Sequence, residues 1–264
     1  MGLIGIAILL GIVEGLTEFL PVSSTGHLIV AGHLLGFRGE TAETFEIFIQ
    51  LGAILAVVVL ERRVFLDLLR PSARAGFAGP RGCGLLLTTT VPALIAGALL
   101  HDWIKTNLFG PATVAFALLA GGIVILVVES VRPGTTVADI GGLGFGKALA
   151  IGLFQCLALW PGVSRSGATI VGGLLCGLER RTAATYSFVA AVPVMAAATL
   201  YDLLKSWSHL GPQDVAPFAV GFLVSFVSAY AAMRVFVALL GRTTLRPFAW
   251  YRILIAPAVY FLVK

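Results

Sequence analysis

Charged residues are scarce in this sequence of 264 amino acids, because only 12% are Asp, Glu, Lys or Arg while 58% are hydrophobic. An ordinary soluble domain has roughly 25% charged residues. A chain of this composition cannot cover its surface with water-compatible side chains, which excludes a soluble globular fold. Lipid must therefore be the solvent for most of the protein.

Cysteine is also rare. Cys83, Cys156 and Cys176 lie far apart and form no CxxC pair, which excludes a zinc knuckle and a disulfide framework. The net charge of +5 comes from basic residues that lie between apolar runs, without the interleaved aromatic residues that would stack nucleic-acid bases. We therefore predict no nucleic-acid partner.

Six apolar stretches approach the length of about 20 residues that a membrane-spanning helix needs. They cover residues 44–61, 85–100, 112–129, 184–201, 216–240 and 249–263. Two further apolar stretches, 3–36 and 147–178, are interrupted near the middle by PVSSTG (21–26) and PGVSRSG (161–167). Irregular backbone at membrane depth is tolerated only inside protein or beside a wet cavity, so we interpret both as re-entrant helical hairpins. The run 3–13 lacks the features of a secretory signal, and we expect it in the mature protein.

A shift of 141 residues aligns the two hairpins with each other. Between 11 and 44, 13 of 34 positions are identical to their counterparts, including the pairs Ser23/Ser164 and Gly26/Gly167. Each half then holds one hairpin and three spans, and an odd number of spans turns the second half upside down. We predict one all-α, polytopic membrane domain (1–264) built as an inverted repeat of residues 1–130 and 147–264.

Basic residues collect on one side of this topology. If the N-terminus lies on the first side, the second side holds most of them: Arg62, Arg63, Arg70, Arg74, Arg81, Arg132, Lys147, Arg180, Arg181, Arg242 and Arg246. The first side has Arg38, Lys105, Lys205 and Lys264. The positive-inside rule makes the second side cytoplasmic and places both termini outside.

The first hairpin carries two carboxylates, Glu14 and Glu18, four residues apart on one helical face. Carboxylates are costly in lipid, and such a pair suits a hard divalent cation, Mg²⁺ or Ca²⁺. A hydroxyl-rich turn and a histidine follow: Ser23, Ser24, Thr25, Gly26 and His27. The alternative is a helix end in interfacial water with ordinary capping.

The second hairpin offers a guanidinium, Arg165, flanked by hydroxyls and followed directly by a helix. Arginine suits bidentate contact with phosphate, and a helix N-terminus favours an anion. We therefore predict a phosphate site that includes Ser164, Ser166, Gly167 and Thr169. The alternative for Arg165 is a structural ion pair with Glu14 or Glu18, which would not exclude phosphate binding.

The two tips together supply a metal site, an arginine, a histidine and hydroxyls, which are the parts that phosphoryl transfer needs. Hydrolysis of a phosphoanhydride fits them, and the alternative is a transporter or scramblase of lipid phosphates or other anions. His27 is predicted to be essential, as the nucleophile or as a general base for Ser24 or for water. Glu46 and Gln50 are second-tier candidates for the same cavity, and Thr88 to Thr90 are interpreted as a helix start.

The strings EGLTEFLPVSSTGH (14–27) and PGVSRSGAT (161–169) resemble the two motifs of the bacterial undecaprenyl-diphosphate phosphatases, also called bacitracin-resistance proteins. The resemblance extends over nearly the whole chain, including TFEIFIQLGAILAVV (44–58). It implies a divalent-metal hydrolase of the bacterial plasma membrane that removes one phosphate from undecaprenyl diphosphate and so recycles a carrier lipid of peptidoglycan synthesis. By motif position, the important residues fall on Glu14, Glu18, Ser24, His27, Ser164, Arg165 and Thr169.

These lines combine into one expectation for the site. Glu14 and Glu18 hold the metal; Glu18, Ser24, His27 and Arg165 are catalytic; the substrate-binding residues are Ser23, Thr25, Gly26, Ser164, Ser166, Gly167 and Thr169. The site opens to the outer face. The polyprenyl chain needs an apolar groove, for which the Phe-rich span 216–240 is one candidate. Lipid-facing and dimer surfaces have similar composition, so a homodimer stays open.

Overall fold

The computed structural model describes residues 2–71, 76–131, 134–206 and 211–262. Within these ranges the chain is almost entirely helical, and its only strand-like pairing is an isolated bridge between Val137 and Leu178. Three of the basic residues used for orientation, Arg74, Arg132 and Lys264, lie outside the described residues. The predicted all-α class is confirmed.

Five helices are long and apolar enough to cross a membrane. They are α3 (Glu40–Leu60), α5 (Gly79–Asn107), α6 (Pro111–Val131), α9 (Arg180–Ser206) and α10 (Val215–Leu240). Each contains one of the six predicted stretches, except that α3 ends one residue before its stretch does. The sixth stretch corresponds to α11 (Arg246–Leu262), which has 17 residues. Short helices α4 (Arg62–Leu68), η1 (Ile140–Gly142) and η4 (Pro212–Asp214) lie in the connections.

Two pairs of shorter helices form the predicted hairpins. α1 (Leu3–Thr17) and α2 (Ser24–Leu35) are joined by the first tip, residues 18–23; α7 (Phe145–Cys156) and η2 (Leu157–Leu159) lead through the second tip, residues 160–164, to α8 (Arg165–Leu175). The predicted hydroxyl-rich turn is wrong in one respect. Ser24 and Thr25 already belong to α2, because Ser23 caps that helix.

The start of α5 also differs from the prediction. Thr88, Thr89 and Thr90 lie in the interior of the helix, which begins nine residues earlier at Gly79. The Thr88 hydroxyl donates to the Gly84 carbonyl of the previous turn and the Thr89 hydroxyl bonds to the Tyr186 hydroxyl of α9, whereas the buried Thr90 hydroxyl has no hydrogen-bond partner among the described residues. Threonines are compatible with a helix interior where neighbouring carbonyls and side chains satisfy their hydroxyls.

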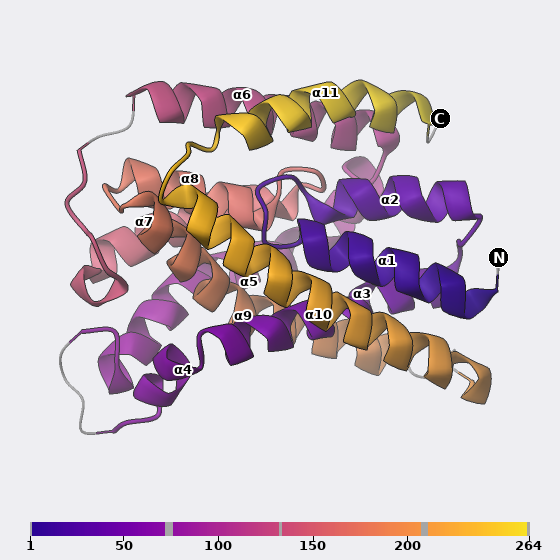
Figure 1. Cartoon of the computed structure of the whole chain (residues 1–264), viewed down its shortest axis with the longest axis horizontal. Coiled ribbons are helices and arrows are strands. Elements are labelled where there is room, and N and C mark those ends of the chain that lie inside the picture. Colours follow the sequence, from indigo (N-terminus) through magenta and orange to yellow (C-terminus); the bar gives the residue numbers. More distant parts are fainter. Residues whose placement is uncertain (1, 72–75, 132–133, 207–210, 263–264) are drawn as a thin grey trace.

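The two hairpins pack against different long helices. α1 packs on α10 and α3, whereas α7 packs on α5, and α6 packs along α11 (Figure 1). The start of α1 and the end of α11 lie at the same end of the bundle, and α4 lies at the opposite end (Figure 1). At the end of α6, the buried Glu129 pairs with Arg180 of α9 and accepts a hydrogen bond from the Leu245 amide at 2.8 Å.

The core lies between the hairpin tips and α9. Phe19 of the first tip is fully buried and packs edge to face on Phe188 of α9, with ring centroids 5.3 Å apart. The helix that follows the second tip, α8, also packs against α9. The two tips are thereby brought together on one helix, α9, although they are about 140 residues apart in sequence.

Candidate active site

Both tips contain a serine in the same unusual backbone conformation. Ser23 has φ 71° and ψ 97°, and Ser164 has φ 72° and ψ 115°. They are the only non-glycine residues with positive φ in the described part of the chain. Each hydroxyl accepts a hydrogen bond from the amide three residues later, Gly26 at 3.5 Å and Gly167 at 3.1 Å. The two serines therefore begin α2 and α8 in the same way, as N-caps.

The tips also touch each other and the neighbouring helix α6. The Ser166 hydroxyl donates to the Leu20 carbonyl of the first tip at 2.9 Å and lies 3.0 Å from the Ser164 hydroxyl. Gly162 has φ 98°, and a Cβ there would meet the Val114 carbonyl of α6 at 2.6 Å. Glycine is required at this position both for the backbone conformation and for the close approach.

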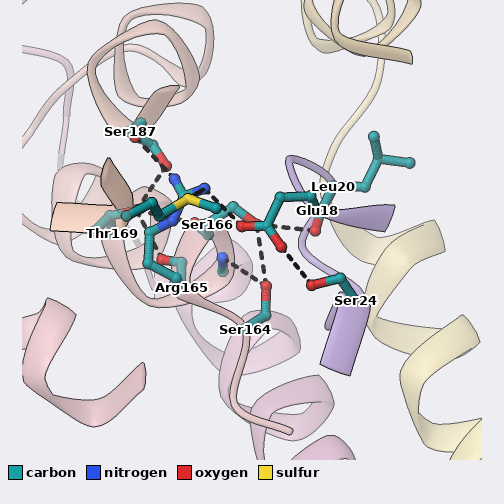
Figure 2. Close-up of polar contacts among 10 residues, drawn as sticks. Glu18, Leu20, Ser24, Ser164, Arg165, Ser166, Thr169 and Ser187 are labelled. Carbon is teal, nitrogen blue, oxygen red and sulfur yellow. Dashed lines mark hydrogen bonds and ion pairs between the residues drawn. The ribbon is translucent and has the colours of Figure 1, made fainter. Parts of the chain in front are cut away.

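Arg165, the first residue of α8, connects the second tip to the first tip and to α9 (Figure 2). Its Nη2 lies 3.0 Å from Oε1 of Glu18 and 3.2 Å from the Met195 sulfur, and its Nη1 donates to the Ser187 carbonyl at 3.0 Å. The guanidinium also stacks over the Phe19 ring, 5.1 Å from its centroid. The alternative of an ion pair with Glu18 is thus what this structure contains.

Glu18 makes two contacts, one on each carboxylate oxygen. Oε1 pairs with Arg165, and Oε2 accepts the hydrogen bond of the Ser24 hydroxyl (Figure 2). Ser24 sits in the first turn of α2. The group within hydrogen-bond reach of the Ser24 hydroxyl is therefore the Glu18 carboxylate, whereas the sequence offered His27 as a base for Ser24.

Glu14 lies one helical turn before Glu18 and is fully buried. Neither of its carboxylate oxygens has a hydrogen-bond partner among the described residues. Glu46 of α3 is close enough to interact electrostatically with it, as are Glu18 and Arg165. Gln50 follows one turn later on α3 and is half-buried. A buried carboxylate without a partner requires a proton or a cation.

The described residues contain no group of three His, Cys, Asp or Glu side chains in metal-binding arrangement. The predicted pair of metal ligands is also divided, because Glu18 is engaged by Arg165 and Ser24 while Glu14 is not. Glu14, with Glu46 near it, is the part of the site that fits a hard cation, since carboxylate oxygens are the ligands such ions prefer.

His27 lies in the first turn of α2, and both its ring nitrogens are engaged. Nδ1 lies 2.7 Å from the Ser23 carbonyl, and Nε2 lies 2.6 Å from the Tyr251 hydroxyl of α11. Since a carbonyl only accepts, Nδ1 carries a proton, and in the neutral form of the ring Nε2 accepts a hydrogen bond from the tyrosine. The His27 and Tyr251 rings are stacked, with centroids 5.5 Å apart and planes at 5°.

The remaining predicted residues lie around the two helix starts. Thr169 bonds the Arg165 carbonyl at 2.9 Å and the Ser187 hydroxyl at 2.6 Å, so it fixes α8 against α9. Gly26 and Gly167 supply the capped amides, and Gly26 is buried while Thr25 is half-buried. The predicted residues of both motifs thus gather at one place in the bundle.

Sequence reasoning missed Arg252 of α11, which is fully buried. Its guanidinium donates only to backbone carbonyls: Pro21 at 3.2 Å in the first tip, Gly162 at 3.0 Å and Val163 at 2.9 Å in the second tip, and Ala117 at 3.1 Å and Leu118 at 3.2 Å in α6. The signal was a single arginine inside an apolar span, which marks a functional position by default.

Sequence reasoning also missed Ser187 of α9. It is fully buried, its carbonyl holds Arg165 and its hydroxyl holds Thr169 (Figure 2). At the shift of 141 residues it is the counterpart of Glu46. The repeat alignment, carried two residues past Thr44, would have identified it.

The arrangement brings groups that suit an anion close to a carboxylate that suits a cation. Arg165 and the starts of α2 and α8, whose positive dipole ends meet at the tips, favour a phosphate. The Ser24 hydroxyl has a carboxylate partner that can accept its proton, and the carboxylate of Glu14 suits a cation. These are the components of a phosphoryl-transfer centre.

Known proteins resemble this chain over nearly its whole length. The family model described as bacitracin resistance protein BacA matches residues 7–258. The protein named undecaprenyl-diphosphatase from Nitratidesulfovibrio vulgaris (strain DP4) is 59% identical over 255 residues, which cover 97% of this chain and 96% of the relative. Proteins with the same name from Maridesulfovibrio salexigens and Solidesulfovibrio magneticus are 58% and 52% identical, with coverage of 96% or more.

Proposed function

The chain belongs to the bacitracin resistance protein family, and on that premise we propose that it is an undecaprenyl-diphosphatase of the membrane. It hydrolyses undecaprenyl diphosphate to undecaprenyl phosphate and inorganic phosphate, which returns the carrier lipid to cell-wall synthesis. The observation that carries the proposal is the meeting of Arg165, Glu18 and Ser24 between two helix N-termini. Close relatives bear the name of this activity.

Arg165 binds the terminal phosphate of the substrate in this proposal. Its pairing with Glu18 holds the guanidinium in place before substrate arrives, and its bond to the Ser187 carbonyl fixes the plane of the fork. A planar guanidinium can contact two phosphate oxygens, and a pre-positioned charge stabilises the negative charge that develops in the transition state. The α8 N-terminus adds its dipole at the same point.

Ser24 is the proposed nucleophile and Glu18 its general base. The Ser24 oxygen attacks the terminal phosphorus, Glu18 accepts the hydroxyl proton, and the bond from phosphorus to the bridging oxygen breaks, with undecaprenyl phosphate as the leaving group. Water then hydrolyses the phosphoserine to free serine and inorganic phosphate. The hydrogen bond from Ser24 to Glu18 supports these roles.

His27 is proposed as a positioning residue at the first tip. Its protonated Nδ1 holds the Ser23 carbonyl, the residue directly before Ser24, and Tyr251 holds the opposite edge of the ring. Loss of the imidazole would release the cap and the attacking hydroxyl together. This role agrees with the prediction that His27 is essential and assigns the base to Glu18.

The proposed cofactor is Mg²⁺ or Ca²⁺, held by Glu14 with Glu46 as a further ligand. The unpartnered, fully buried carboxylate of Glu14 supports this assignment. When bound, the cation supplies positive charge to the diphosphate and so weakens the bond to the leaving group. Gln50, one turn along α3, is proposed to orient Glu46 or its ligand water.

The membrane arrangement that we propose has α3, α5, α6, α9, α10 and α11 as six spans and the two hairpins as re-entrant elements in an inverted repeat. Three observations support it: the matched conformations of Ser23 and Ser164, the pairing of α1 with α10 and of α7 with α5, and the two hairpins meeting at their tips. By the positive-inside rule both termini lie outside, and the site opens to the outer face of the bacterial plasma membrane.

The test is phosphate release by the purified full chain in detergent. With undecaprenyl diphosphate and Mg²⁺ we expect catalytic release of inorganic phosphate, which stops on chelation and returns when Mg²⁺ or Ca²⁺ is added. Ser24→Ala should abolish release, and a phosphoserine at position 24 should be trapped by rapid acid quenching. No release, combined with movement of the lipid between vesicle leaflets, would identify a scramblase instead.

A further inference from the structure

An apolar groove lies on the bilayer side of the second tip. It has a volume of about 180 Å³ and is formed by α6, the end of α7 with η2, the second tip and the first turns of α8. Its walls are almost entirely hydrocarbon, with small residues of α6 such as Ala117, Ala120 and Gly121 at the base. Arg252 requires glycine at position 121, since a Cβ there would collide with its guanidinium.

The groove and the proposed phosphate site lie on opposite sides of the second tip. Ser164 and Arg165 face the polar site, whereas Val163 and Gly167, on either side of them in sequence, line the groove. The Gly167 amide lies 3.1 Å from the Ser164 hydroxyl. A molecule held by its phosphate at this tip therefore has an apolar channel directly beside its point of attachment.

Aromatic side chains mark the bilayer end of the groove. Trp160 of the second tip stacks on Phe116 of α6, with ring centroids 5.7 Å apart, and both line the groove. Phe116 is 57% exposed and Leu157 beside it 58%, so this end opens to the hydrocarbon of the membrane. The Trp160 indole nitrogen is buried and has no hydrogen-bond partner among the described residues.

The corresponding place at the first tip is filled. The aligned counterpart of Ala168, which lines the groove, is His27, and its ring stacks on Tyr251 of α11. The counterpart of Gly167 is Gly26, where an added Cβ would meet the Leu118 side chain at 3.3 Å. The second tip, which carries the proposed phosphate-binding arginine, has the apolar groove at this position.

We propose that this groove binds the first isoprene units of the polyprenyl chain while the diphosphate occupies the site between the tips. The inference rests on the proposed function and extends it, because it assigns the lipid subsite to α6, η2 and α8 instead of the span 216–240. A diphosphate-linked chain has its hydrocarbon attached directly to the reacting group, so the chain must leave the site through an apolar path at the tip. Burial of that chain supplies binding energy remote from the chemistry.

The test compares a long and a short substrate on variants that fill the groove. Ala120→Phe and Val124→Trp place aromatic rings inside it, and Ala112→Phe puts the same ring on an exposed position of α6 outside it. We expect the ratio of kcat/KM for undecaprenyl diphosphate to that for methyl diphosphate, which has no isoprene unit to place in the groove, to fall about tenfold or more in the two groove variants, since displaced methylenes cost this much in a hydrophobic pocket. The ratio should keep its wild-type value in Ala112→Phe.

Photolabelling identifies the molecule that occupies the groove without relying on turnover. A polyprenyl diphosphate with a diazirine near the head group should label peptides of α6 and of residues 154–168 in the wild-type protein, with less labelling in Ala120→Phe. Labelling that is equally strong with a diazirine phospholipid, and that polyprenyl diphosphate does not compete, would make the groove an ordinary lipid contact and overturn the proposal. An unchanged substrate ratio in monodisperse groove variants would overturn it as well.

The failure of the two proposals can be told apart. If the wild-type protein releases no phosphate from either substrate, the proposed phosphatase function fails, and labelling of the groove still reports whether a polyprenyl diphosphate binds there. If phosphate is released and labelling maps to α10, the proposed phosphatase function is supported, the groove proposal fails, and the lipid subsite lies in the span 216–240.

Discussion

The first tip, residues 18–23, and the second tip, residues 160–164, end in serines whose φ angles are 71° and 72°, and both serines cap the helix that follows. The side chains next to this shared backbone are opposite in chemistry. Ser24 with its carboxylate partner follows Ser23, whereas Arg165 follows Ser164. The comparison shows that the two tips share a turn and a helix start and differ in side chains, which in the proposed mechanism separates a nucleophile side from a phosphate side.

The largest expected effect comes from removing the chemistry of the second tip while its charge is kept. Arg165→Lys should lower kcat by about 10²-fold or more, because a lysine cannot hold the Ser187 carbonyl, Glu18 and a phosphate at the same time. The measurement is phosphate release at saturating lipid. The matched control is Arg181→Lys on the exposed face of α9. Turnover of Arg165→Lys near the wild-type rate would remove Arg165 from the phosphate side.

The next largest effect is a loss of stability at both tips, caused by removing the guanidinium of Arg252. Arg252→Met should lower the free energy of unfolding by about 3 kcal/mol, since it leaves buried carbonyls of both tips without donors. Arg252→Lys should be intermediate. The melting temperature of the purified protein in detergent measures this, and Arg234→Met, on an exposed position of α10, is the control. Equal melting of Arg252→Met and wild type would show that the tips hold together without this residue.

Glu14→Gln makes the first hairpin resemble the second, which has Gln155 at the aligned position. We expect the Mg²⁺ concentration for half-maximal activity to rise about tenfold or more, because the site loses a charged ligand. Titration calorimetry with Mg²⁺ gives the same answer without turnover. Glu179→Gln, on an exposed carboxylate after the second hairpin, should leave the Mg²⁺ dependence unchanged. An unchanged dependence in Glu14→Gln would place the cation elsewhere.

The smallest effect tests the shared backbone itself. Ser23→Ala and Ser164→Ala should each destabilise the protein by about 1–2 kcal/mol, because the cap is lost and the strained φ is kept. Ser23→Gly and Ser164→Gly should cost less, since glycine adopts positive φ freely. Melting temperatures of the four variants provide the measurement. A loss confined to one tip would break the structural equivalence of the two turns.

Hydropathy alone predicted the positions of the long helices. A membrane-spanning segment must satisfy its backbone polar groups internally, as a helix, and its side chains must be apolar, so each span appears as a continuous apolar run. The limits of α5 were not predictable from hydropathy, because its first turns, from Gly79 to Gly84, contain glycine, proline and arginine. The hydroxyl turn was predicted too long because Ser23, by capping α2, brings Ser24 into the helix.

Motif spacing identified Glu14, Glu18, Ser24 and Arg165, since costly polar residues at membrane depth are conspicuous in sequence. It offered an ion pair of Arg165 with Glu14 or Glu18 as an alternative but could not choose between the two glutamates, because that depends on how two segments about 140 residues apart meet. The contact of Glu18 with Ser24 was not predicted. Arg252 acts on carbonyl groups, and backbone acceptors leave no pattern in side-chain sequence. Its role required the folded arrangement.

Arg252 also bears on how the molecule moves. One side chain of α11 holds Pro21 in the first half and Gly162 and Val163 in the second. A carrier that alternates access rocks one repeat against the other around a central site. In the arrangement that we propose, such rocking would break the hydrogen bonds from Arg252 to one tip or the other, so these bonds favour a fixed site over a carrier.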